Sequence, residues 1–158
     1  MLLHRLRLYI DTSVFGGCFD EEFEAASNRL VDAIRTGRYA GIVSEVVLTE
    51  VREAPKHVQD RFASIPLESL ELLSLSSEAI ALREAYLDAG IVGPKWRGDA
   101  GHVALATITR ADALVSWNFR HLVRLDKIRQ FNHINLLQNY GLIQIISPLE
   151  VFTDEEEG

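Results

Sequence analysis

The amino-acid sequence predicts an α/β fold, namely a three-layer α/β/α sandwich with a mostly parallel central sheet. Short apolar segments rich in strand-forming residues alternate along the chain with longer segments of helical periodicity. Strands that alternate with helices are typical of a parallel sheet covered by helices on both faces. The chain has 158 residues, of which 47% are hydrophobic and 25% charged, as expected for one ordinary globular domain.

Five short segments are expected to be strands, because they are apolar and rich in residues that favour an extended backbone. They are residues 6–10, 39–43, 70–75, 113–116 and 142–146. The first strand ends at Asp11, and Gly16 and Gly17 are expected to interrupt regular structure after it. The fourth strand is followed closely by Asn118.

Three helices are expected in the first half of the chain. They cover residues 21–36, 45–54 and 56–63. Asp20 is a suitable N-cap for the first helix, and Gly37 is placed to end it. Ser44 is a good N-cap for the second helix, and Pro55 separates the second helix from the third.

Three further helices are expected in the second half. They cover residues 77–89, 99–110 and most of 119–140. Ser76 or Ser77 caps the first of them, and Gly90 ends it. The helix over residues 99–110 is nearly free of charge, since Asp99 and Arg110 at its ends are its only charged residues. A helix that is apolar all round is expected to be buried.

The net charge of −7 lies partly in the last residues of the chain. Asp154, Glu155, Glu156 and Glu157 carry four of the negative charges, which leaves the rest near −3. We therefore expect one domain over residues 1–152 and a disordered acidic tail over residues 153–158. The acidic balance argues against non-specific affinity for nucleic acid. Five basic residues could nevertheless flank a local phosphate track: Lys95, Arg97, Arg120, His121 and Arg124.

Cysteine content and targeting signals point to the cytoplasm. The single cysteine, Cys18, excludes an internal disulfide and fits a reducing compartment. The N-terminal residues lack the unbroken apolar core of a signal peptide. No apolar run approaches the roughly 20 residues that a membrane span needs. We therefore expect a cytoplasmic protein with no membrane partner.

Three carboxylates stand in otherwise apolar surroundings. Asp11 follows the first strand, Glu50 lies within an apolar helix, and Asp99 begins the uncharged helix. Since a buried charge is costly unless it is paired, a hard divalent cation is the simplest common partner for converging carboxylates. This favours a Mg²⁺- or Mn²⁺-dependent hydrolase of phosphate esters. Ligands bind beyond the carboxyl ends of parallel strands, so Asp11 and Asn118 are expected to share one crevice.

Helix geometry separates Glu50 from the other acids of its helix. Successive side chains rotate by about 100° around a helix. This rotation places Glu50 within the arc of the apolar side chains, whereas Glu45 and Glu53 fall on the opposite, polar side. Glu50 is therefore the acid of this helix that is expected to point inward.

Each candidate also has a structural interpretation, which stays open at this point. Asp11 could form a turn with nearby backbone amides, and Asn118 fits a turn as well as a cation ligand. Asp99 could act only as a cap that complements the helix dipole, and Glu50 could pair with a base at an exposed edge. His102 lies one turn after Asp99 and is either a buried core histidine or a residue that orients a carboxylate or contacts substrate.

Four segments, in order along the chain, resemble the four motifs of the PIN domain. They are Asp11-Thr12-Ser13, residues 44–50 with Glu50 at the acidic position, residues 99–106 and residues 111–119. The match covers most of the chain, and the size and arrangement resemble VapC-type toxins of bacterial toxin–antitoxin systems. The resemblance implies a parallel α/β/α sandwich that hydrolyses RNA, a homodimer, and a small antitoxin protein as a partner.

The resemblance also assigns roles to residues. It implies Asp11, Glu50, Asp99 and Asn118 as catalytic residues, the first three as ligands of Mg²⁺ or Mn²⁺. It places Thr12, Ser13 and His102 in supporting positions around them. The fourth position often carries aspartate in this family, so Asn118 removes one ligand charge, although three carboxylates can still hold one metal ion.

Two other functions compete with the ribonuclease. A PIN-like module that binds RNA or protein without cutting is suggested by Asn118 and by the acidic net charge. A metal phosphatase acting on a small substrate is the third possibility. The absence of an Asp-x-Asp motif, since position 13 is serine, and of a glycine loop that cradles phosphate counts against it.

Overall fold

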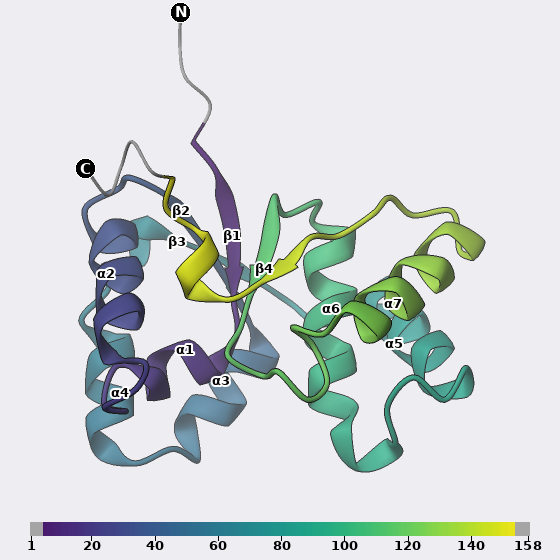
Figure 1. The fold of residues 1–158 in the computed structure, drawn as a ribbon, viewed down its shortest axis with the longest axis horizontal. Coiled ribbons are helices and arrows are strands. Elements are labelled where there is room, and N and C mark those ends of the chain that lie inside the picture. The colour runs from purple at the N-terminus through teal and green to yellow at the C-terminus, as the bar shows by residue number, and fades with distance from the viewer. Residues whose placement is uncertain (1–4, 154–158) are drawn as a thin grey trace, which may run out of the picture.

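A computed structural model of the chain describes residues 5–153. Within this range the centre of the molecule is a five-stranded sheet in which every neighbouring pair is parallel, in the order β3-β2-β1-β4-β5 (Figure 1). Its strands are β1 (Arg7–Ile10), β2 (Ala40–Ser44), β3 (Leu70–Leu73), β4 (Ala113–Val115) and β5 (Ile145–Ile146). The expected α/β class with a parallel central sheet is confirmed.

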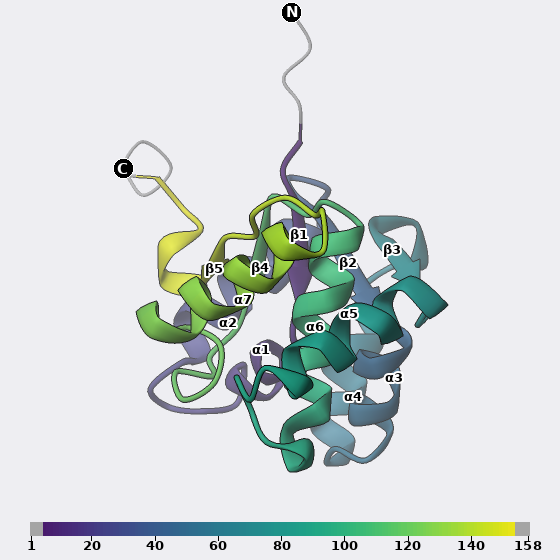
Figure 2. The ribbon, with the colours of Figure 1, turned by 90° about the vertical axis from the view of Figure 1, so that its right-hand side faces the viewer.

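Helices cover both faces of this sheet. They are α1 (Thr12–Gly17), α2 (Glu24–Arg35), α3 (Glu45–Arg52), α4 (Lys56–Ala63), α5 (Ser77–Asp88), α6 (Arg97–Ile108) and α7 (Leu125–Leu137). In Figure 1, α1, α2 and α4 lie on one side of the strands and α5, α6 and α7 lie on the other. Figure 2 looks onto the second group, in which α5 packs against α6. The three-layer arrangement is therefore confirmed.

Strand β1 and helix α6 form the interior of the molecule. β1 lies in the middle of the sheet, and its residues Tyr9 and Ile10 are fully buried. α6 is buried without interruption from Ala100 to Thr107, as expected for a helix that is apolar all round. The backbone amide of Asp11 donates to the carbonyl of Val115 at 3.1 Å, which keeps β1 and β4 in register to their carboxyl ends.

Most of the predicted helix boundaries are confirmed. The Ser44 side chain accepts hydrogen bonds from the first turn of α3, and the Ser76 side chain does the same for α5. Gly37 and Gly90 follow α2 and α5 with φ angles of +84° and +72°, a conformation in which glycine carries no steric penalty.

Two expectations near the N-terminus are wrong. Gly16 and Gly17 do not interrupt regular structure, because they lie inside α1. Asp20 does not cap a helix that begins at residue 21. Its carboxylate accepts from the Glu22 amide at 2.9 Å and its carbonyl from the amides that follow, which forms a turn. α2 therefore begins only at Glu24.

Two expectations near the C-terminus are too long. The helix expected over residues 119–140 begins only at Leu125, because Asn118 first closes a turn over the residues that follow it. The strand expected over residues 142–146 is limited to Ile145–Ile146. The side chain of Asn132 in α7 binds both the amide and the carbonyl of Ile143, at 2.8 and 3.1 Å, and so withholds Ile143 from the sheet.

The domain boundaries remain predictions. The expected boundary at residue 152 is not tested by the fold, and the acidic tail beyond Thr153 lies outside the described residues. Among the helices within residues 5–153, none has the length and apolar character needed to cross a bilayer.

An ion pair between β1 and β3 makes stability depend on pH. Arg7 meets Glu71 with two nitrogens, at 2.8 and 2.9 Å. The hydrogen bond from Arg7 lowers the pKa of Glu71 below its ordinary value. Because the pKa is lower in the folded state, the stabilisation is present at neutral pH and is lost as the pH falls through the pKa of Glu71.

We expect Glu71→Gln to lower the free energy of unfolding at pH 7 by less than about 1 kcal/mol, since both side chains are partly exposed. The measurement is urea unfolding at neutral and at acidic pH, where the variant and the wild type should converge. Glu68→Gln, in the neighbouring turn, is the control and should change nothing. A difference that stays constant with pH would contradict the argument.

Candidate metal centre

Asp11 is buried where β1 ends and α1 begins. Its Oδ2 accepts hydrogen bonds from the hydroxyls of Ser13, at 2.9 Å, and Ser116, at 2.5 Å. Ser116 directly follows β4, so the two neighbouring strand ends meet at this carboxylate. Ser13, which the sequence placed beside the site, also accepts from the backbone amide of Trp117 at 3.0 Å.

Glu50 reaches the same place from α3. Its Oε1 accepts from the hydroxyl of Thr12 at 3.2 Å and lies 2.5 Å from Nε2 of His102. Burial raises the pKa of Glu50, but the hydrogen bonds from His102 and Thr12 and the charge of His102 outweigh burial and leave this pKa below its ordinary value. Glu45 and Glu53 are exposed on the same helix, in agreement with the helical geometry that predicted an inward Glu50.

His102 is fully buried between the two carboxylates. Its Nε2 lies 3.4 Å from Oδ1 of Asp11, and its Nδ1 is 2.8 Å from the hydroxyl of Tyr9, which in turn contacts Ser44 at 2.7 Å. Burial by itself lowers the pKa of His102, but Tyr9, Asp11 and Glu50 outweigh burial and raise it well above its ordinary value. His102 is therefore a core histidine that also contacts two carboxylates.

Asp99 approaches from the first turn of α6. Its Oδ2 lies 3.2 Å from the amide nitrogen of Asn118 and 3.0 Å from Nδ1 of His121. Burial raises the pKa of Asp99, the hydrogen bond with His121 lowers it, and the negative charge of Asp11 raises it again, so that it lies above its ordinary value. Asn118, whose side chain donates to Asp99, also donates through its backbone amide to the hydroxyl of Ser116, which in turn donates to Asp11, so the two carboxylates are linked through the turn after β4.

Asn118 uses both polar atoms of its side chain. Its amide nitrogen donates to Asp99, and its Oδ1 accepts from the backbone amides of Arg120 and His121 at 3.1 and 2.9 Å. The oxygen that a cation would need is therefore engaged with the turn after β4. In this arrangement Asn118 positions Asp99.

The three carboxylates share one pattern. Side chains hold Oδ2 of Asp11, Oε1 of Glu50 and Oδ2 of Asp99. The second oxygen of each carboxylate has no hydrogen-bond donor within residues 5–153, apart from the ion-pair contact of His102 with Oδ1 of Asp11. Each acid is thus fixed through one oxygen; the other oxygen of Glu50 and of Asp99 has no donor in this part of the chain, and that of Asp11 contacts only His102.

This set of donors fits a divalent cation. Among the described residues, Asp11, Glu50 and His102 each offer one ligand atom, and these atoms lie within 4.8 Å of one another. Carboxylate oxygens are the ligands that Mg²⁺ and Mn²⁺ prefer, whereas both ring nitrogens of His102 are already engaged, with Glu50 and with Tyr9. The sequence predicted Asp11, Glu50 and Asp99 as the ligands. In the structure His102 rather than Asp99 completes the tightest group, and Asp99 is connected to Asp11 through Asn118 and Ser116.

The sequence did not identify every residue that shapes the centre. Tyr9, Ser44 and Ser116 were expected only as parts of strands or caps, and His121 only as a flank of a phosphate track. Ser116 was detectable in principle, because it follows β4 as Asp11 follows β1, and the ends of neighbouring parallel strands meet at one edge. No local feature of the sequence predicts that the buried hydroxyl of Tyr9 contacts His102.

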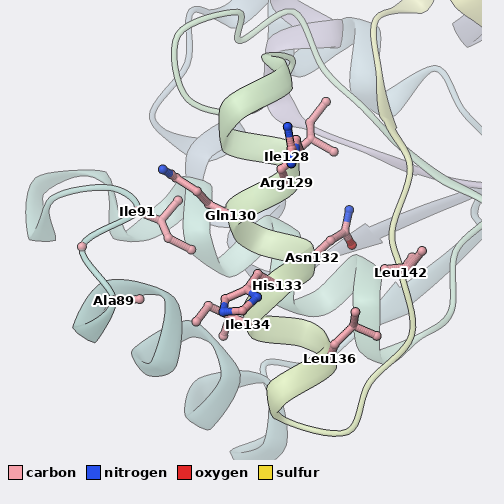
Figure 3. Close-up of a pocket in the computed structure, with 11 residues that line it drawn as sticks. Ala89, Ile91, Ile128, Arg129, Gln130, Asn132, His133, Ile134, Leu136 and Leu142 are labelled. Carbon is pink, nitrogen blue, oxygen red and sulfur yellow. The ribbon is translucent and has the colours of Figure 1, made fainter.

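A separate hollow lies along α7 (Figure 3). It has a volume of about 700 Å³ and is lined by α7 and the segment that follows α5. Figure 3 shows His133, Asn132 and Leu136 of α7 around it. Asp11, Glu50, His102 and Asp99 do not line this hollow, so it is distinct from the carboxylate centre.

Comparison with known proteins identifies a family and a fold. The family model described as PIN domain matches residues 7–120 of the chain, which include Asp11, Glu50, Asp99 and Asn118. No curated protein matches the chain. The matched segment contains β1, β2, β3 and β4 together with every residue of the carboxylate centre except His121.

Several solved structures are similar to this chain. The crystal structure of VapBC2 from Rickettsia felis, bound to a DNA fragment from its promoter, has a TM-score of 0.57 and 14% identity, over 90% of this chain and 98% of that one. The structure of FitAcB from Neisseria gonorrhoeae has a TM-score of 0.58 and 11% identity, over 91% and 99%. A toxin–antitoxin complex from Klebsiella pneumoniae has a TM-score of 0.54 and 16% identity, over 72% and 88%. At such low sequence identity, these similarities show a shared fold and nothing more specific.

Proposed function

The chain belongs to the PIN domain family, and from this premise we propose that it is a Mg²⁺- or Mn²⁺-dependent endoribonuclease that serves as the toxin of a toxin–antitoxin pair. One observation carries the proposal. Asp11 at the end of β1, Glu50 in α3 and His102 in α6 offer ligand atoms within 4.8 Å of one another, and Asp99 in α6 is linked to Asp11 through Asn118 and Ser116.

Asp11 and Glu50 would hold the cation, with His102 beside them and Asp99 linked to Asp11 through Asn118 and Ser116. A bound divalent cation supplies positive charge that lowers the pKa of a water and offsets the charge of a phosphate group. Ser13 and Ser116 keep Asp11 in one orientation, and Thr12 does the same for Glu50. Fixed orientation matters, because residues that support metal ligands typically contribute 10- to 100-fold to affinity or activity.

On the opposite side, Asn118 and His121 keep Asp99 in place. Asp99 is also the acid whose pKa is raised, by burial and by Asp11, so it is the carboxylate best suited to accept a proton from water during hydrolysis. Asn118 thus acts through Asp99, and its lack of charge is compatible with one metal ion.

The partners follow from the solved structures to which the chain is similar. The structure from Klebsiella pneumoniae is a toxin–antitoxin complex, which supports a small antitoxin protein as the partner of this chain. We extend the proposal to a homodimer in the cytoplasm, where RNA is the substrate. The competing function, a PIN-like module that binds RNA without cutting, is favoured by one feature, since the oxygen of Asn118 is engaged with the backbone.

The test is cleavage of labelled single-stranded RNA by the purified protein. We expect cleavage with Mn²⁺ or Mg²⁺ and none with excess EDTA, because the cation supplies the charge that the carboxylates hold in place. Asp99→Asn should slow cleavage by about 100-fold or more. Equal cleavage by wild type and variant would indicate a contaminating nuclease. Binding of RNA without any cleavage would favour the non-cutting module.

A further inference from the structure

An aromatic and basic cluster lies beside the carboxylate centre and has no part in holding its acids. It consists of Lys95, Trp96 and Arg120. Trp96 ends the short turn before α6, and its ring lies 4.6 Å from the ring of His121, centroid to centroid. Two cations lie over the same indole: Nζ of Lys95 at 5.1 Å and the guanidinium carbon of Arg120 at 5.4 Å. Trp96 is half-buried, and both cations are exposed.

These two cations differ from their basic neighbours in lacking an acidic partner. Arg97 pairs with Glu84 at 2.8 Å, and Arg124 pairs with Asp126 at the same distance. In the part of the chain that the structure describes, no carboxylate lies within ion-pair distance of Lys95 or Arg120. Their charges are therefore available to an anion.

The cluster is directly connected to the proposed metal centre. The ring of His121 packs against Trp96 and lies 3.0 Å from Oδ2 of Asp99 through its Nδ1. Arg120 is held in the turn whose backbone amides bind Asn118. A ligand that touches Trp96 and Arg120 would thus lie next to the carboxylates, on the side of Asp99.

We propose that Lys95, Trp96 and Arg120 form a substrate subsite in which the two cations contact phosphates and the indole ring stacks against an unpaired base. Aromatic rings that carry stacked bases, flanked by cations that follow the backbone, are the usual means of holding single-stranded nucleic acid. Duplex RNA keeps its bases stacked inside and offers mainly phosphates and hydroxyls. This proposal rests on the proposed ribonuclease function, since it places the substrate at the same carboxylates.

The experiment measures binding of a fluorescent RNA by proteins that also carry Asp11→Asn, so that the RNA stays intact in Mg²⁺. Trp96→Ala should weaken binding of single-stranded RNA roughly tenfold, and Trp96→Phe should retain most of the affinity. Arg120→Ala and Lys95→Ala should each reduce the slope of log affinity against log salt concentration, by the amount expected for the loss of about one phosphate contact. Arg129→Ala is the matched control, because it removes one positive charge from α7 beside the hollow of Figure 3. It should change neither the RNA affinity nor the salt dependence of binding.

Binding of a duplex RNA of the same length shows whether Trp96→Ala acts through the loss of base stacking or by disturbing the protein fold. Trp96→Ala should leave duplex binding unchanged, whereas a disturbed fold would weaken binding of both RNAs. A disturbed fold would also lower the Mn²⁺ affinity, measured by calorimetry, of a Trp96→Ala variant that keeps Asp11. If the Trp96, Lys95 and Arg120 variants bind single-stranded RNA as tightly as their parent while the wild type cleaves RNA, the subsite is wrong and the ribonuclease stands. If the wild type neither binds nor cleaves RNA, both proposals fall together.

Discussion

Asp11→Asn is expected to abolish metal-dependent cleavage of RNA, with a loss of about 100-fold or more, while the fold is kept. Asparagine retains one oxygen that can accept from Ser13 and Ser116, so the local hydrogen bonds survive. What disappears is the negative charge at the centre of the proposed ligand group. Because Asp11 raises the pKa of Asp99, the substitution also removes a like-charge repulsion.

Thermal unfolding with and without Mn²⁺ measures the same effect independently of activity. A ligand at 100 times its dissociation constant stabilises the folded state by about 2.7 kcal/mol. The wild type should therefore unfold at a higher temperature when Mn²⁺ is added, and Asp11→Asn should not. Asp88→Asn, at the exposed end of α5, is the matched control and should behave as the wild type. An Mn²⁺ response that survives in Asp11→Asn would sink the assignment of Asp11 as a ligand.

The fold was predictable because its signals are local. Strand β1, the cap at Ser44 and the boundary of α4 at Pro55 each follow from a few neighbouring residues. The alternation of these elements then fixes the class, since parallel strands need crossover helices. Asp11 was predictable for the same reason, because the end of a buried strand is visible in the sequence.

The contacts of His102 were not predictable in this way. Spacing along α6 places His102 and Asp99 on one face, one turn apart. In the structure the two side chains nevertheless have different partners: Asp99 meets the turn after β4, whereas His102 meets Tyr9 and Glu50. Which strand faces which turn of a helix depends on tertiary packing, and a single sequence carries no local signal for it.

The error at Gly16 and Gly17 has a clear physical cause. Glycine is a poor helix former by intrinsic propensity, so two in succession favour a break. Here both glycines lie in α1, and at Gly17 the neighbouring side chains leave no room for a larger residue. A Cβ on Gly17 would meet Oγ of Ser27 at 2.6 Å and Nε1 of Trp117 at 2.7 Å, whereas a Cβ on Gly16 would meet nothing within 4 Å.

Opposite effects on stability are therefore expected from the same substitution at these two neighbouring positions. Gly16→Ala should stabilise the protein by about 0.5–1 kcal/mol, because alanine favours the helix and the site is open. Gly17→Ala should destabilise it by about 1–3 kcal/mol, because Ser27 and Trp117 are buried and hydrogen-bonded to each other at 2.7 Å, so neither can yield freely.

Urea unfolding of the two variants and the wild type measures these changes. Gly17→Ala should also weaken Mn²⁺ binding, since the backbone amide of Trp117 holds the hydroxyl of Ser13, which in turn holds Asp11. Gly16→Ala touches none of these groups and should bind Mn²⁺ as the wild type does. If both variants shift stability in the same direction, α1 does not pack against Trp117 as described, and the support that it gives to Asp11 has to be sought elsewhere.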